Sequence, residues 1–80
     1  MNDYIKFIIS VVESHPGITG IDLSLAVMNR INPVRWETEE YLAALNYCTM
    51  EDRISAYSFK LPTVDNLKSV YFPKDTRFIS

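Results

Sequence analysis

The densest group of charged side chains in this 80-residue sequence lies between residues 30 and 40. Two cations, Arg30 and Arg35, come first, and three carboxylates follow at Glu37, Glu39 and Glu40. Guanidinium groups bind phosphates and carboxylates, whereas carboxylates accept hydrogen bonds from basic groups. This pattern favours recognition of a charged partner.

Catalytic chemistry has little support in the sequence. It contains no glycine-rich phosphate loop, nucleophile elbow or HExxH pattern. The single histidine, His15, and the single cysteine, Cys48, are too few to form a zinc site. We expect His15 at the surface and Cys48 on a buried helix face. We therefore predict that the protein is not an enzyme and has no cofactor and no metal.

Composition predicts one compact domain over residues 1–80. Apolar residues make up 48% of the chain, two glycines occur, and the formal net charge is −2. Such a short chain has room for one hydrophobic core. No apolar run approaches the length needed to span a bilayer, and the first residues are acidic where a signal peptide is basic. We expect a cytoplasmic protein with no membrane contact.

Hydrophobic spacing predicts three helices, at about 2–14, 20–29 and 34–50. Thr19 is a suitable N-cap for the second helix, with Asp22 completing a variant of the capping box. The third helix has two possible starts, at Asn32 followed by Pro33, or later at Thr38. Its predicted buried stripe is Leu42, Leu45 and Cys48 or Thr49, flanked by Tyr41 and Ala44.

After the third helix the pattern changes to the alternation typical of strands. We predict strands at about 54–61 and 69–73, forming an antiparallel hairpin. Phe78 and Ile79 suggest docking of the last residues or a short third strand. The expected core combines one stripe of the first helix with residues from each later element: Ile5, Ile8, Ile9, Val12, Leu23, Ala26, Leu42, Leu45, Ile54 and Phe59.

This order of elements resembles the winged helix-turn-helix superfamily, an α+β fold of three helices followed by a β-hairpin wing. Residues 16–23, PGITGIDL, resemble the entry to that family's second helix. Residues 45–54, LNYCTMEDRI, resemble the exit from its third helix, with Cys48 in the place of the family's second apolar residue and Asp52 in place of a glycine. Aspartate tolerates the left-handed conformation that this position requires.

The resemblance implies DNA binding, with the third helix in the major groove and the wing near phosphates. Charge is divided along the chain: residues 1–52 hold three cations and eight carboxylates, for −5, and residues 53–80 hold five and two, for +3. We predict a small DNA-binding transcriptional regulator. A homodimer would suit it, because one module reads few bases. The candidate contacts are Arg30, Arg35, Lys60, Lys68 and Lys74.

The alternative is an accessory or inhibitory module that binds a protein instead of DNA. Carboxylates near the start of the third helix would repel phosphates. They suit either a basic protein surface or, in a purely structural role, the positive end of the helix dipole on a solvated face. The candidate contacts are then Trp36, Glu37, Glu39 and Glu40. Trp36 has a second interpretation, as a residue packed at the turn between helices. Tyr57 and Tyr71 likewise fit either a stacking surface with the wing lysines or ordinary packing.

Overall fold

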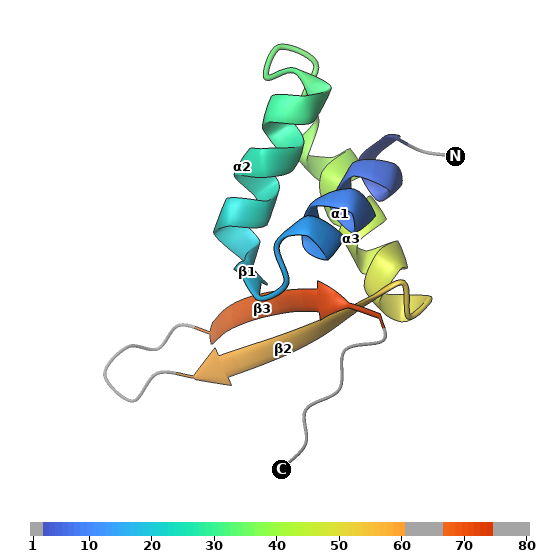
Figure 1. Ribbon diagram of the computed structural model, residues 1–80. Helices are drawn as coiled ribbons and strands as arrows, with labels where there is room; N and C mark the ends of the chain where they lie inside the picture. Colours follow the sequence, from blue (N-terminus) through green and yellow to red (C-terminus); the bar gives the residue numbers. More distant parts are fainter. Residues whose placement is uncertain (1–2, 61–66, 75–80) are drawn as a thin grey trace.

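The computed structural model describes residues 3–60 and 67–74. It shows an α+β arrangement of three helices and a three-stranded antiparallel sheet (Figure 1). The elements in chain order are α1 (Asp3–Ser14), β1 (Ile18–Thr19), α2 (Gly20–Ile31), α3 (Thr38–Met50), β2 (Ile54–Lys60) and β3 (Leu67–Pro73). None of the helices in these ranges has the length and apolarity needed to span a bilayer.

The first two helices begin where the sequence predicts. The helix α1 includes Asp3, whose carboxylate stands in the first turn, where the helix dipole favours negative charge. At the start of α2 the Thr19 hydroxyl accepts a hydrogen bond of 3.2 Å from the Asp22 backbone N–H, which confirms the predicted cap. The helix α2 continues two residues beyond the predicted end and stops at Ile31.

The third helix begins at Thr38, so the predicted start at 34 is wrong and the later alternative is right. Asn32 ends α2 with φ of 103°, and its side-chain oxygen accepts a hydrogen bond of 3.0 Å from the Val34 N–H. The Arg35 N–H donates to the Asn32 carbonyl at 2.9 Å. Because asparagine satisfies these local backbone groups in a turn, it competes with the helix start that Pro33 would favour.

The sheet has the order β1-β3-β2. Strands β2 and β3 form the predicted hairpin, with Ala56 opposite Tyr71 and Ile54 opposite Pro73. The third strand is β1, where Ile18 pairs with Tyr71, and β3 starts two residues earlier than predicted. The predicted end of the first strand at residue 61 and the suggested strand at Phe78 and Ile79 lie outside the described residues.

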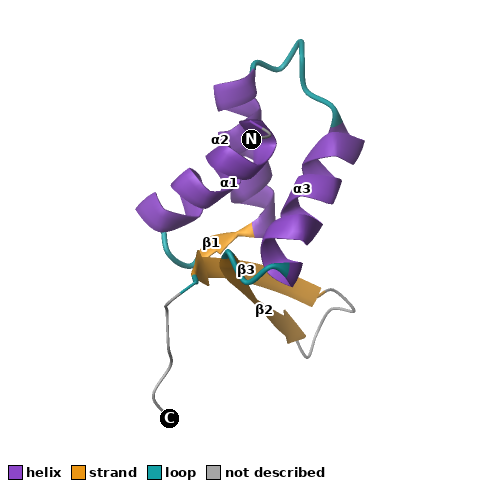
Figure 2. Cartoon of the chain, turned by 90° about the vertical axis from the view of Figure 1, so that its right-hand side faces the viewer, coloured by secondary structure: helices purple, strands orange, loops and turns teal. Residues whose placement is uncertain are grey.

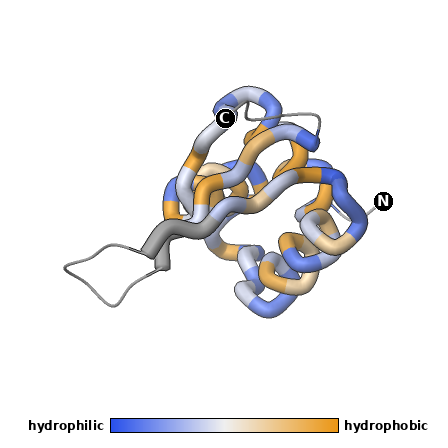
Figure 3. Tube along the Cα trace, turned by 90° about the horizontal axis from the view of Figure 1, so that it is seen from below, coloured by the Kyte–Doolittle hydropathy of each residue, from blue (hydrophilic) through white to orange (hydrophobic). Residues whose placement is uncertain are grey.

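All three helices lie on one face of the sheet (Figure 2), and Figure 3 views the molecule from the sheet side. The hydrophobic core lies between these layers and contains residues of α1, α2, α3, β2 and β3. Its buried members are Tyr4, Ile8, Val11, Val12, Leu23, Val27, Tyr41, Ala44, Cys48, Ile54 and Tyr71.

Several residues of the expected core are less buried than predicted. Leu42 is 54% exposed, so its predicted burial is wrong, and Tyr41 and Ala44 occupy the buried face instead. The residues that are only partly buried against the core are Ile5, Ile9, Ala26 and Leu45. The Phe59 side chain lies outside the described part of the structure. The buried side of α3 is thus centred on Tyr41, Ala44 and Cys48, which means that the helix is rotated about its axis toward the Tyr41 and Ala44 flank of the predicted stripe.

Candidate functional site

Beyond its first turn, which carries the exposed residues Glu39 and Glu40, the helix α3 presents an uncharged, largely apolar surface to solvent. Its buried side carries Tyr41, Ala44 and Cys48. The opposite side forms what we call the α3 stripe, a continuous row of exposed residues at helical spacing: Leu42, Ala43, Asn46, Tyr47 and Met50. The helix contains no lysine and no arginine anywhere along its length.

A groove runs along one side of this stripe, between α3 and the sheet. It has a volume of about 550 Å³. The helix contributes one wall, and Ala56 of β2 and Tyr71 of β3 contribute the other. Every lining residue is uncharged: Leu42, Ala43, Leu45, Asn46, Thr49, Ala56 and Tyr71. We call this the α3–sheet groove; its chemistry suits an apolar side chain.

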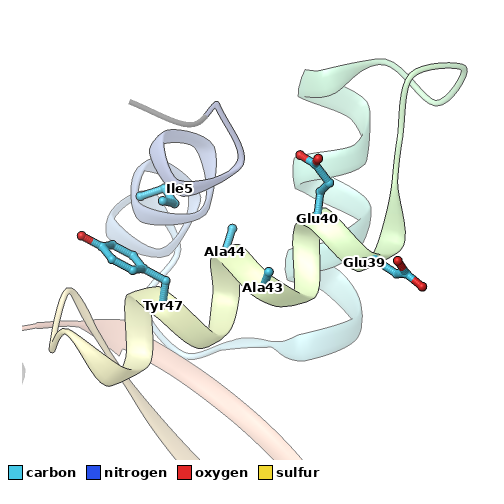
Figure 4. Close-up of a pocket in the computed structure, with 6 residues that line it drawn as sticks. All are labelled: Ile5, Glu39, Glu40, Ala43, Ala44 and Tyr47. Carbon is cyan, nitrogen blue, oxygen red and sulfur yellow. The ribbon is translucent and has the colours of Figure 1, made fainter.

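A second hollow, of about 380 Å³, lies on the other side of the stripe, between α1 and α3 (Figure 4). Ile5, Ala43 and Ala44 give it apolar walls, and Tyr47 stands at one end. The carboxylates of Glu39 and Glu40 stand at the other end, in the first turn of α3. This hollow offers both apolar contact and negative charge.

Trp36 fixes the start of α3 against α1. Its ring lies 4.8 Å from the Tyr41 ring and 5.6 Å, edge-on, from the Tyr4 ring, measured between centroids. Its indole N–H donates a hydrogen bond of 3.1 Å to the Thr38 hydroxyl. Such contacts are those of a packing residue, since offset and edge-on aromatic pairs stabilise cores. The structure therefore supports the packing interpretation of Trp36, whereas Glu37, Glu39 and Glu40 are exposed.

The three cations predicted to contact DNA whose side chains are described, Arg30, Arg35 and Lys74, do not gather on one surface. Arg30 and Arg35 are exposed near the turn between α2 and α3, which lies at the opposite end of the helices from the sheet (Figure 1). Both line a third hollow, together with the carboxylate-bearing residues Asp3 and Glu40. Lys74 is exposed directly after β3.

The two wing lysines are placed by backbone register only. Lys60 pairs with Leu67 and Lys68 with Phe59, toward the connecting end of the hairpin. Tyr57 and Tyr71 do not form one stacking surface. Tyr57 pairs with Val70, next to Tyr71, so the two tyrosines lie on opposite faces of the sheet.

Burial changes the acidity of two groups. Desolvation raises the pKa of the Cys48 thiol, and the nearby Arg53 charge opposes this only partly. Burial, followed by interaction with Tyr71, raises the pKa of the Tyr41 hydroxyl above its ordinary range. The Tyr41 hydroxyl also has no hydrogen-bond partner among the described residues. A protonated, buried Cys48 acts as a small apolar residue, as the sequence predicts.

Residues 3–60 and 67–74 contain no cluster of three or more histidine, cysteine or carboxylate side chains positioned to hold a metal ion. No family model, curated protein or solved structure matches the chain. The α3–sheet groove was not predicted from the sequence, because the hydrophobic spacing predicted that Leu42 would be buried in the core.

Proposed function

We propose that this protein is a winged-helix domain that binds another protein through the α3 stripe. The layout supports the fold assignment: the order α1-β1-α2-α3-β2-β3, with strands arranged β1-β3-β2, has the helix-turn-helix followed by a hairpin that the winged-helix resemblance implies. In this layout α3 takes the place of the recognition helix.

One observation carries the binding proposal. Beyond its first turn, the helix in the recognition-helix position presents apolar and uncharged residues: Leu42 is 54% exposed and Met50 is 74% exposed, and no cation occurs from Thr38 to Met50. DNA binding draws much of its affinity from lysine and arginine contacts with phosphates. Exposed apolar side chains beside a groove are instead typical of protein interfaces.

The chemistry on either side of the stripe defines the partner. The α3–sheet groove takes an apolar side chain, because all its lining residues are uncharged. The hollow between α1 and α3 adds the Glu39 and Glu40 carboxylates. A complementary partner presents an apolar ridge with a lysine or arginine beside it.

Binding of duplex DNA stays a prediction, and it now depends on cations at one end of the hairpin. Arg53 and Lys74 are exposed at the same end of the hairpin, where Ile54 pairs with Pro73. These two cations are remote from Arg30 and Arg35, and the exposed carboxylates of Glu51 and Asp52 directly precede Arg53 in the chain. Anisotropy of a labelled random duplex, measured at about 50 mM salt and high micromolar protein, tests for this contact.

A matched pair of variants tests the protein-binding proposal. Leu42→Lys places a charge in the α3 stripe, and Ile21→Lys makes the same change in charge on α2, at a side chain that is 74% exposed. Cross-linked partners are captured with each variant from cells that produce the protein and are quantified by mass spectrometry. We expect the wild type and Ile21→Lys to capture the same partner and Leu42→Lys to lose it. Equal capture by both variants would contradict the proposal.

A further inference from the structure

The strand β2 lies at the edge of the sheet, and no described strand pairs with its outer side. Exposed edges are usually protected by charged residues, proline or a bulge, since their free backbone groups can pair with another chain. Residues 54–59 of β2 contain no charge and no proline. The edge is therefore chemically open over most of its length.

The backbone register identifies the groups on this edge. The Tyr71 carbonyl accepts a hydrogen bond of 2.8 Å from the Gly17 N–H, so the backbone of Tyr71 points toward the β1 side. Its partner Ala56 then belongs to a pair without mutual hydrogen bonds, and the Ala56 N–H and C=O point outward. Ile54, two residues away, has the same orientation, which agrees with its position opposite Pro73, a residue without an N–H.

Ala56 also joins this edge to the α3–sheet groove. Its side chain is exposed and lines the groove. An antiparallel strand added to β2 would form a hydrogen-bonded pair at Ala56, and the side chains of directly opposed residues lie on the same face. The residue opposite Ala56 would thus stand beside the groove, and the small alanine leaves room for a large side chain.

From this placement we propose that β2 accepts an extended segment of the partner protein as a fourth strand, with a large apolar side chain opposite Ala56 entering the α3–sheet groove. Such strand addition combines main-chain hydrogen bonds, which give affinity, with a side-chain pocket, which gives specificity. This inference rests on the proposed function and names how the partner binds.

A second copy of the chain fits this site less well. Antiparallel self-pairing that uses the outward-pointing groups brings Ala56, Ser58 or Ile54 opposite Ala56, depending on register. Alanine and serine are too small to fill the groove, and Ile54 is already buried in its own core, at 2% exposure. None of these residues supplies the free, large apolar side chain that the groove accommodates, which favours a different protein.

The test uses a phage-displayed library of random decapeptides selected on the full-length wild-type protein. The key variant is Ala56→Pro, which removes the outward N–H but no hydrogen bond between β2 and β3. Ala56→Ser is the matched control, because it keeps the N–H and a small side chain. We expect selected peptides to carry a large apolar residue, to bind wild type and Ala56→Ser alike, and to bind Ala56→Pro at least about tenfold more weakly.

Hydrogen exchange on the wild type keeps the proposal testable if Ala56→Pro does not fold. The Ile54 and Ala56 amides should exchange more slowly when a selected peptide is bound. A contrary result is a selected peptide that protects neither amide from exchange and yet fails to bind the Leu42→Lys variant. That result would overturn strand addition but would leave the proposed binding through the α3 stripe intact. Absence of any enriched peptide would overturn the inference. So would a wild-type dimer in sedimentation that Ala56→Pro makes monomeric, since the edge would then be occupied by a second copy.

Discussion

The Tyr4 hydroxyl accepts a hydrogen bond of 2.9 Å from the backbone N–H of Glu37, the residue that precedes α3. This contact joins α1 to the start of the third helix across 33 positions of sequence. Because this contact holds the residue that precedes α3, it fixes the rotation of α3 about its axis. That rotation decides which α3 residues face solvent.

We predict that Tyr4→Phe lowers the free energy of unfolding by about 1–2 kcal/mol, since the Glu37 N–H loses a partner in a partly buried place. Urea unfolding followed by the fluorescence of Trp36, the only tryptophan, measures this change. The control is Tyr47→Phe on the exposed α3 stripe, which should change stability by less than about 0.5 kcal/mol. Equal effects in the two variants would show that the Tyr4 hydrogen bond does not stabilise the start of α3.

Removing the hydroxyl of Tyr41 should have the opposite effect. Tyr41 is 4% exposed and its hydroxyl has no hydrogen-bond partner within residues 3–60 and 67–74, so burial of this group costs free energy without compensation. Tyr41→Phe is expected to leave the protein equally stable or more stable by up to about 1 kcal/mol. A loss of more than about 1 kcal/mol in urea unfolding would mean that the hydroxyl is satisfied in solution, for example by a buried water molecule.

Local signals in the sequence predicted several features correctly because each depends on neighbouring residues. The Thr19 cap requires only the Asp22 amide three positions ahead, and the positive φ of Asp52 follows from the short turn between α3 and β2. The rotation of α3 was not predictable in this way. It depends on Trp36 packing against both Tyr4 and Tyr41, a contact between α1 and α3.

For the candidate site too, local sequence patterns predicted only part of what the structure shows. The acidic start of α3 is visible in the sequence, and the structure keeps Glu39 and Glu40 together beside one hollow. The α3–sheet groove requires Ala56 and Tyr71 to face α3 across the chain. No local pattern predicts that pairing, because tertiary packing decides which side of a helix is buried.

Asp52 offers a test of backbone strain. Its φ is 55°, in the left-handed region that glycine adopts without cost. Asp52→Gly should therefore stabilise the protein by up to about 1 kcal/mol, and Asp52→Ala should destabilise it by a similar amount. Thermal unfolding of both variants beside the wild type measures the two shifts. If alanine proved as stable as glycine, the left-handed conformation would not be present in solution.

Burial of Cys48 predicts both its reactivity and a pH dependence. The thiol is fully buried and its pKa is raised, so a thiol-specific reagent should label it only after unfolding. The folded state holds this proton more tightly than the unfolded state does. The stabilising contribution is therefore complete below the unfolded pKa of about 8.5 and is lost as the pH rises above it.

Urea unfolding at about pH 7.5 and pH 9.5 should show a loss of stability in the wild type that is smaller in Cys48→Ala. Both proteins contain the same tyrosines, which begin to ionise near the upper end of this range. Rapid labelling of the folded protein, or identical pH dependence in the two proteins, would contradict the buried placement of Cys48.

The most direct test of the central claim is site-specific photo-cross-linking from the α3 stripe. Benzoylphenylalanine replaces Leu42 in one protein and Ile21 in the other, and both are irradiated in cells that produce the protein. We predict a discrete protein adduct from position 42 that unlabelled wild type competes away and unlabelled Leu42→Lys does not, with no such adduct from position 21. A DNA adduct at position 42, or the same protein adducts from both positions, would contradict the claim that α3 is a protein-binding surface.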